Sequence, residues 1–87
     1  MYEKTFIKNF YRKIANKAII LYKYQNEYYD INKTIFKDII TKDMFKIISP
    51  FKENNNDVVY ISNVKDELDT YRIKIDDFMM NFIPYDK

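Results

Sequence analysis

The residues of this chain with the greatest capacity for chemistry are carboxylates in its C-terminal third. The densest acidic cluster, together with a nearby lysine, comprises Asp66, Glu67, Asp69, Lys74, Asp76 and Asp77. Carboxylates that hold a divalent cation next to a lysine are the components of a metal-dependent nuclease site. Acidic groups of this density also arise in small domains from a solvated turn followed by the first turn of a helix. The sequence favours this second, structural interpretation and predicts no metal site.

Other catalytic chemistries are excluded by the residue types that the sequence lacks. It contains no His, no Cys and no Gly. Imidazole proton shuttles, nucleophilic thiols, the usual zinc ligands and glycine-rich phosphate loops are therefore all missing. The two serines, Ser49 and Ser62, have no His to act as a base and no glycine for a nucleophile elbow. We predict that the protein is not an enzyme and that it uses no cofactor.

The nine tyrosines indicate a binding function instead. Tyrosine combines a large, rigid apolar area with a polar tip, and it is enriched at protein interfaces and their energetic centres. Hairpin tips and loops are the places where small proteins present contact residues. The alternative is that the tyrosines cover the outer face of a hairpin. The predicted partner-binding residues are Tyr22, Tyr24, Tyr28, Tyr29, Asn54, Asn55, Asn56, Asp66, Glu67 and Asp69.

Charge is unevenly distributed along the chain, although the net charge is only +2. Residues 1–23 carry six basic side chains and one acidic side chain, whereas residues 57–87 carry four basic and seven acidic. Lysines interleaved with aromatic residues suit a nucleic-acid surface, because lysines meet phosphates and rings stack on unpaired bases. The competing interpretation is a solvated helix face. The residues of this alternative site are Lys4, Lys8, Arg12, Lys13 and Lys17.

These features together predict a small non-catalytic module that binds another protein or a protein–nucleic acid complex. Ile, Lys, Asn, Tyr and Asp dominate the sequence, which is the residue usage of an AT-rich gene. We therefore expect a phage or mobile-element protein that inhibits a host enzyme or defence complex, with an anti-CRISPR-like role as one option. The first alternative is a nucleic-acid-binding protein. The second is a self-associating structural accessory protein, which would form a homo-oligomer.

The sequence shows no segment that is suited to a membrane. The longest apolar run, residues 18–22, is far shorter than the roughly 20 residues that span a bilayer. Basic residues interrupt residues 1–18, so this segment lacks the continuous apolar centre of a signal peptide. We expect a cytoplasmic protein, located in the host cytoplasm if a phage encodes it.

The spacing of apolar side chains predicts the elements that position these residues. Apolar residues recur every three or four positions over residues 3–17, which predicts an amphipathic helix with the basic residues on another face. Residues 18–24 and 28–32 are rich in β-branched and aromatic side chains. This composition predicts a β-hairpin that turns at residues 25–27.

Helical spacing returns over residues 34–48 and predicts a second helix. It ends before Pro50, because the residue that precedes a proline is disfavoured in the helical region. Thr41 could cap a further short helix after a break. The polar segment 52–57 predicts a flexible loop, and residues 58–64 predict a strand.

The last part of the chain fits two patterns. Residues 69–75 alternate polar and apolar side chains as a strand does, yet residues 68–82 also keep helical spacing. We favour a strand to Ile75 and then a short helix that Asp76 caps and that ends before Pro84. The predicted fold is a single α+β domain over residues 1–87, ordered α-ββ-α-ββ-α, with a mostly antiparallel sheet packed by two to three helices.

Tight turns are a particular problem in a chain without glycine. A turn residue with positive φ has to be Asn or Asp here, because these residues tolerate the left-handed conformation best after glycine. The residues predicted for such turns are Asn26, Asn54, Asn55, Asn56, Asn63 and Asp66.

Overall fold

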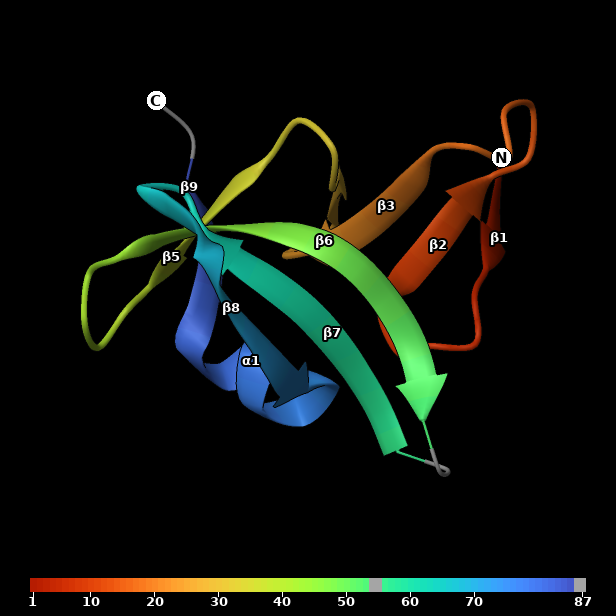
Figure 1. Cartoon of the computed structure of the whole chain (residues 1–87). Coiled ribbons are helices and arrows are strands. Elements are labelled where there is room, and N and C mark those ends of the chain that lie inside the picture. The colour runs from red at the N-terminus through yellow and green to blue at the C-terminus, as the bar shows by residue number, and fades with distance from the viewer. Residues whose placement is uncertain (54–55, 86–87) are drawn as a thin grey trace.

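The structure, a computed structural model, describes residues 1–53 and 56–85, which form two antiparallel sheets and one short helix (Figure 1). The first sheet is a meander in the order β1-β2-β3-β4, so each strand lies beside its neighbour in the sequence. Its strands are β1 (Tyr2–Lys4), β2 (Phe10–Lys13), β3 (Ile20–Tyr24) and β4 (Glu27–Asp30).

The second sheet has the order β8-β7-β6-β5-β9, so β9 lies beside β5 and not beside β8. Helix α1 packs against β7 and β8 and carries the chain from one edge of the sheet to the other. The elements of this part are β5 (Ile35–Asp38), β6 (Met44–Glu53), β7 (Asn56–Asn63), β8 (Asp66–Lys74), α1 (Ile75–Asn81) and β9 (Phe82–Tyr85).

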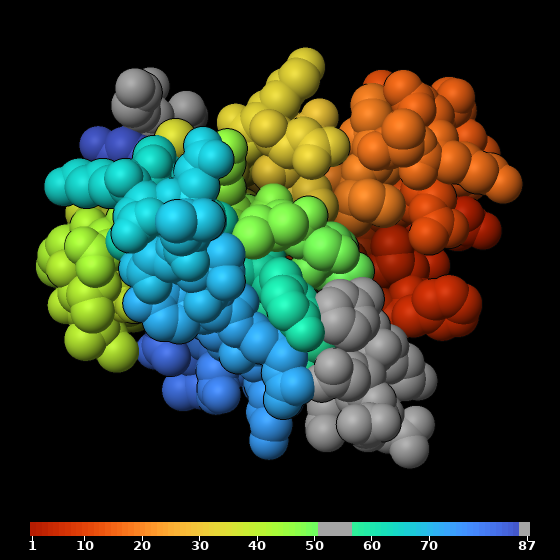
Figure 2. All heavy atoms as spheres, in the orientation of Figure 1, coloured from red at the N-terminus to blue at the C-terminus, as the bar shows by residue number. Residues whose placement is uncertain are grey.

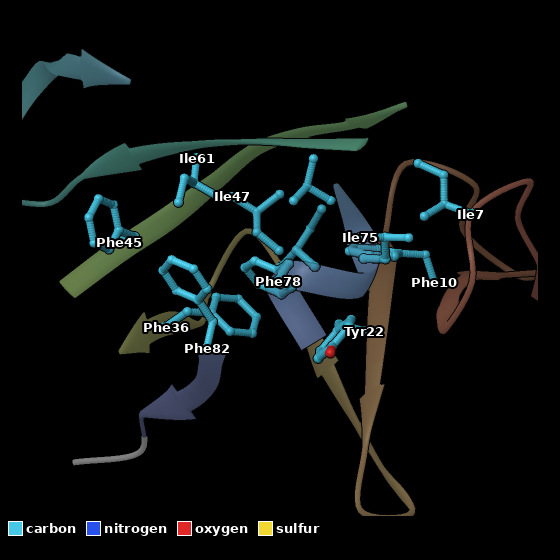
Figure 3. Close-up of a cluster of buried hydrophobic side chains, with 12 residues drawn as sticks. Ile7, Phe10, Tyr22, Phe36, Phe45, Ile47, Ile61, Ile75, Phe78 and Phe82 are labelled. Carbon is cyan, nitrogen blue, oxygen red and sulfur yellow. The ribbon is translucent and has the colours of Figure 1, made fainter. Parts of the chain in front are cut away.

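The core lies where the two sheets and α1 meet, and aromatic side chains occupy its centre (Figure 3). The ring of Tyr22 from β3 meets Phe36 from β5 edge to face, with centroids 5.7 Å apart. The same ring lies 5.5 Å from Phe78 of α1, and Phe78 stacks on Phe82 at 5.0 Å. Phe78 therefore links the first sheet to the second.

Alternation along the strands decides which face of each sheet is buried, because successive side chains point to opposite faces. In the first sheet, Phe10 is paired with Tyr22, and both side chains are buried. In the second sheet, Ile47 is paired with Ile61, and both are again buried. Each sheet thus contributes one face to the common core.

Residues other than glycine adopt the positive φ angles that the turns require. The φ angles are 65° at Asn9, 50° at Gln25, 65° at Asn26 and 71° at Lys42. Gln25 and Asn26 form the two-residue connection between β3 and β4, where consecutive left-handed residues match the twist of a hairpin. The prediction for Asn26 is therefore confirmed.

None of the other predicted turn residues that the structure describes has a positive φ. Asn54 and Asn55 lie outside the described residues, and Asn56 begins β7. Asn63 and Asp66 flank the β7–β8 turn without a positive φ. Their side-chain oxygens instead accept the backbone N–H two residues later, at 2.8 and 3.1 Å respectively, and thereby stabilise the turn.

The predicted N-terminal helix is wrong, because residues 3–17 contain most of β1, all of β2 and their turns. Apolar residues also recur three or four positions apart when a tight turn separates two short strands, and Asn9 provides such a turn here. Ile7 and Phe10 are buried as the pattern requires. Phe6, which the same pattern assigned to the core face, is 86% exposed.

The predicted helix over residues 34–48 is wrong for a different reason. This segment contains β5 and the first half of β6, joined by a turn at residues 39–43. Its apolar positions are mostly isoleucine, whose branched side chain loses rotamer freedom in a helix and packs well in a sheet. Pro50 does not end a helix either, since it lies within β6 opposite Val59.

The predicted hairpin, the strand at residues 58–64 and the C-terminal strand and helix agree with the sequence pattern, whereas the predicted loop 52–57 is strand in its described residues. The hairpin that turns after Tyr24 is β3–β4, and residues 58–64 fall almost entirely in β7. The C-terminal segment is strand β8 followed by the short helix α1, although Lys74 and not Asp76 is the N-cap residue. In the predicted loop 52–57, residues 52–53 belong to β6 and residues 56–57 to β7, and residues 54–55 lie outside the described part.

The α+β class with the order α-ββ-α-ββ-α is accordingly wrong, and the fold is mostly β. Two of the three predicted helices are strands and turns in the structure, and the third is the seven-residue helix α1. The sheets are antiparallel throughout their described pairings. No helix in the described residues is long and apolar enough to cross a membrane.

Candidate functional site

A cavity of about 360 Å³ opens at the end of the core where the β5–β6 turn and β8 meet. We call it the acidic pocket; its principal residues are Asp38, Ile40, Asp43, Phe45, Tyr71 and Phe82. The floor is apolar, because Phe45 and Phe82 are buried and their rings meet edge to face at 5.6 Å. Ile40 is 72% exposed and adds apolar surface to the lining.

The rim of the acidic pocket is a turn that its own hydrogen bonds hold in place. The Asp38 carboxylate accepts the backbone N–H groups of Ile40 at 2.8 Å and Thr41 at 3.2 Å. The backbone N–H of Lys42 donates to the Asp38 carbonyl at 2.8 Å, and that of Asp43 donates to the Thr41 hydroxyl at 3.2 Å. These bonds hold the Asp38 carboxylate and the backbone of the turn, and Asp38 and Asp43 both lie in the lining beside the aromatic floor.

Tyr71 forms the opposite side of the acidic pocket and is 46% exposed. Its ring meets Phe45 edge to face at 5.8 Å. A hydrogen bond to the Asp69 carboxylate raises the pKa of Tyr71, and the negative charges of Asp69 and Asp43 raise this pKa further. The tyrosine hydroxyl therefore lies close to the carboxylates of Asp69 and Asp43.

Strand β8, which carries Tyr71, is an edge of the second sheet. In the described residues it pairs with β7 and has no partner on its other side. Pairing is regular from Thr70 to Lys74 and shifts before it, where Leu68 is 92% exposed. Alternation places Tyr71 and Ile73 on the pocket side of the sheet. An open strand edge thus runs directly beside the acidic pocket.

The arrangement suits recognition of a cation with an aliphatic stem. Lysine and arginine bury their methylene groups on apolar surface while the charged head seeks carboxylates or aromatic faces. Within residues 1–53 and 56–85, no three His, Cys, Asp or Glu side chains are placed to hold a metal ion.

A second cavity, of about 350 Å³, opens in the region of the first sheet near Pro50 of β6. Phe6, Ile7, Ile20 and Arg12 contribute to its lining. Arg12 is the charged residue of the lining, and its guanidinium lies 3.7 Å from the Glu3 carboxylate. Because its charged group already has a partner, this cavity offers less specific chemistry than the acidic pocket.

The predicted partner-binding residues are separated by the fold. Asp66, Glu67 and Asp69 all lie on β8, and Asp69 contacts Tyr71 at the acidic pocket. Tyr22 is 1% exposed, so it belongs to the core and presents no surface to a partner. Burial, together with the nearby Tyr24, raises the pKa of Tyr22 to about 12.

The other predicted tyrosines and asparagines lie elsewhere. Tyr24 and Tyr29 are half-buried on the core side of the first sheet, where Tyr29 is paired with Tyr22. Tyr28 is on the opposite face. Asn54 and Asn55 are outside the described residues, and Asn56 is in β7.

Three of the pocket residues were missed by the sequence pattern: Asp38, Asp43 and Tyr71. The predicted helix over residues 34–48 gave the two aspartates no common role. The signal that could have found them was the break at residues 41–43, because Asp and Thr next to a break are typical of a tight turn. No local sequence pattern identifies Tyr71 as a pocket residue, since only the pairing of strands that are distant in the sequence brings it to Phe45.

The first sheet presents a second surface, on the face that points away from the core. We call it the tyrosine face; it comprises Tyr2, Lys4, Tyr11, Lys13, Leu21, Lys23, Tyr28 and Asp30. Figure 2 shows the N-terminal strands at one end of the molecule and the region of β8 and the β5–β6 turn towards the other. The tyrosine face and the acidic pocket are therefore separate surfaces.

The basic residues predicted for nucleic-acid binding are divided between surfaces. Lys4 and Lys13 lie on the tyrosine face. Arg12 lies on the other face with Glu3, and Lys8 forms an exposed ion pair of 3.7 Å with Asp76. Lys17 is exposed in the turn between β2 and β3. The structure thus keeps two of the five predicted residues together on the tyrosine face.

Comparison of the chain with family models, with curated proteins and with solved structures finds no match. A fold hosts many functions, so function has to follow from the geometry and chemistry of a site. The acidic pocket and the tyrosine face therefore carry the functional argument.

Proposed function

We propose that the protein is a non-catalytic module that binds an extended segment of another protein along β8 and takes a lysine or arginine side chain of that segment into the acidic pocket. The observation that carries this proposal is the position of a carboxylate-rimmed, aromatic-floored cavity beside an open strand edge. The main chain of the ligand would supply affinity and the pocket would supply specificity.

Strand addition explains how the two features act together. A peptide that pairs with an edge strand lies about 4.8 Å from it and points every second side chain to the same face. Residues of the peptide opposite Tyr71 and Ile73 would therefore lie on the pocket side. One of these side chains is close enough to the cavity to act as an anchor.

The chemistry of the cavity selects a cationic anchor. The methylene groups of a lysine or arginine would cover the rings of Phe45 and Tyr71, and the charged head would approach Asp43 and Asp38. An acidic anchor would meet like charges, and a purely apolar one would leave the carboxylates without a cation. This difference gives the site its selectivity.

A second copy of the chain fits the same edge less well. Antiparallel pairing of two β8 strands keeps like faces together, so it would bring Asp69, Tyr71 and Ile73 of the second copy to the pocket side. None of these residues is a cation. A foreign segment with a basic residue matches the charge of the pocket better than self-association does.

A module of this kind would act as an inhibitor when the captured segment belongs to an enzyme or a defence complex. Small size, the absence of His and Cys, and the residue usage of an AT-rich gene support an inhibitor encoded by a phage or mobile element. The predicted anti-CRISPR-like role belongs to this class.

The test is a selection of random displayed peptides against the purified protein. We expect the selected peptides to share β-branched residues and one lysine or arginine at a fixed position. A synthetic copy of one selected peptide should lose about tenfold or more in affinity for Asp43→Asn and for Tyr71→Ala. Methylation of alternate backbone nitrogens of the peptide should abolish binding, because it removes the main-chain hydrogen bonds to β8.

The matched control is Asp77→Asn, which makes the same chemical change on α1, outside the pocket lining. It should leave the affinity unchanged. Selected peptides without a basic residue, or equal binding by the Asp43→Asn variant, would contradict the proposal. A dimer in sedimentation that Thr70→Pro dissociates would show that a second copy occupies the edge, and it would also overturn the proposal.

A further inference from the structure

The tyrosine face of the first sheet has chemistry that the acidic pocket does not use. Register places its residues on one side: Tyr2 is opposite Lys13, Lys4 is opposite Tyr11, and Lys23 is opposite Tyr28. Directly opposed residues of an antiparallel ladder share a face. Each of these cross-strand pairs therefore combines a tyrosine with a lysine.

The three tyrosines pack into a preformed aromatic cluster. The rings of Tyr2 and Tyr28 have centroids 4.3 Å apart, and Tyr11 meets Tyr28 edge to face at 5.3 Å. Leu21 is 7% exposed on this face, which leaves the cluster with an apolar base. Tyr2 is 41% exposed, so part of its ring is open to a ligand while Tyr11 and Tyr28 hold it in position.

The same face is positively charged. Among the described residues it carries Lys4, Lys13 and Lys23 against the single acid Asp30. The Nζ of Lys23 lies 5.7 Å from the centroid of Tyr28, which places a cation at the edge of the aromatic cluster. The ion pairs of this region in the described residues, Arg12–Glu3 and Lys8–Asp76, leave these three lysines available.

We propose that the tyrosine face binds single-stranded nucleic acid, with an unpaired base stacked on Tyr2 and phosphates beside Lys4, Lys13 and Lys23. Aromatic rings stack on any base, and lysines track the backbone without regard to sequence. The surface therefore recognises the strand through stacking and charge.

The geometry favours a single strand over a duplex. In residues 1–53 and 56–85 the helix that could enter a groove of a nucleic-acid duplex is α1, and it packs against the second sheet and not the first. A base can stack on Tyr2 only when it has left its own stack, which unpaired nucleotides do readily. Lysines on three adjacent strands spread charge over roughly 10 Å, because neighbouring strands are about 4.8 Å apart.

The experiment measures fluorescence anisotropy of labelled single-stranded DNA, single-stranded RNA and duplex DNA of about 12 nucleotides. We expect binding of at least one single strand, weaker binding of the duplex, and a slope of log affinity against log salt of about −2. Each neutralised phosphate contributes about −0.7 to this slope for single strands, and three lysines are involved. A preference for RNA over DNA would assign a role to the 2′-hydroxyl, and either preference supports the proposal.

Variants separate stacking from charge. The triple substitution of Lys4, Lys13 and Lys23 by Gln should abolish binding. Tyr2→Leu should lower affinity by at least about fivefold, whereas Tyr2→Phe, which keeps the ring, should retain most of it. Thermal unfolding of both Tyr2 variants shows that any loss is not a loss of fold.

The matched charge control replaces Lys46, Lys65 and Lys74, three exposed lysines of β6, the β7–β8 turn and β8, by Gln. Net charge falls equally, but binding should persist. Equal loss in both triple variants, equal binding of duplex, an unaffected Tyr2→Leu variant, or no binding of any strand would overturn the proposal. Peptide binding at the acidic pocket should be unchanged in the Tyr2 variants, so failure here is distinct from failure of the proposed protein-binding role.

Discussion

Each of the two sheets buries one face in the common core, but the tyrosine face of the first sheet and the acidic pocket beside the second carry mainly opposite charges. The first sheet joins residues that are close in the sequence and exposes lysines around a tyrosine cluster. The second sheet adds a pairing between distant segments, β5 with β9, in which Phe36 lies opposite Pro84, and it presents carboxylates around the acidic pocket. The uneven distribution of charge along the sequence thus becomes a separation in space between a surface that carries lysines and a surface that carries carboxylates.

The comparison also shows what the sheets share. Tyr22 of the first sheet contacts Phe36 of the second sheet and Phe78 of α1. The two sheets therefore share one core around Tyr22. In a small domain, a single hydrophobic core rarely leaves stability to spare. We therefore expect the two surfaces to appear and disappear together when the protein folds and unfolds.

The largest effect is expected from Phe78→Ala, because Phe78 is fully buried between the sheets. Removal of a buried phenylalanine ring costs about 3–5 kcal/mol, which is a large part of the stability of a small domain. Denaturant unfolding followed by tyrosine fluorescence and by circular dichroism should show one shared, strongly shifted transition. Two separate transitions would mean that the sheets fold independently. Phe6→Ala, at a position that is 86% exposed, is the control and should change stability little.

A smaller loss is expected from Leu21→Ala, which acts on the tyrosine face alone. Leu21 is 7% exposed, and its truncation should cost about 2–3 kcal/mol in the free energy of unfolding, near the lower end of buried leucines. The matched variant Leu68→Ala removes the same atoms from a side chain that is 92% exposed and should stay within about 0.5 kcal/mol. Equal stabilities of the two variants, measured by urea unfolding, would contradict the packing of the tyrosine cluster on Leu21.

Tyr22 should make the stability of the protein depend on pH in the alkaline range. Burial, followed by the nearby Tyr24, raises its pKa to about 12 in the folded state, against 10.0 for an ordinary tyrosine. The unfolded chain therefore releases this proton first, and the stabilisation is complete below pH 10 and is lost as pH rises towards 12. Stability curves of the wild type and Tyr22→Phe between these pH values should show a shallower decline in the variant. Parallel curves would contradict the raised pKa.

The smallest effect is expected from Asp69→Asn at the acidic pocket. The hydrogen bond to Asp69 and the charge of this residue are the leading causes of the raised pKa of Tyr71. The substitution should lower the pKa of Tyr71 towards the ordinary value, as measured by NMR titration of its ring signals. Stability at neutral pH should hardly change, because both groups are partly exposed. An unaltered pKa would place Asp69 away from the tyrosine hydroxyl.

Local patterns predicted the parts of the fold that depend on neighbouring residues. The β3–β4 hairpin followed from aromatic and β-branched residues around Gln25 and Asn26, and β8 and α1 followed from alternation and then helical spacing. The two false helices arose because short strands joined by turns at Asn9 and Lys42 imitate helical spacing. The spacing of apolar residues alone cannot distinguish a helix from two short strands joined by a turn when each strand has only three or four residues.

The candidate site was only partly predictable for a related reason. Asp66, Glu67 and Asp69 were predicted to bind a partner, and the structure places them on β8 outside the lining of the acidic pocket. The residues of the lining come from several segments: Asp43 precedes β6, Phe45 lies on β6, and Tyr71 lies on β8. Strand register over such distances is set by the assembled core, which residue types in one segment do not reveal.

Strand β9 lies at an edge of the second sheet, where its neighbour is β5. This position affects the order in which parts of the fold can form while the chain is being synthesised. As the polypeptide leaves the ribosome, the local hairpins of the first sheet can pair early, and Phe78 and Phe82 emerge after them. Until they arrive, the inner faces of Tyr22 and Phe36 remain uncovered. We expect an arrested nascent chain that stops before Ile75 to stay sensitive to protease, because Phe78 and Phe82 are then missing from the core.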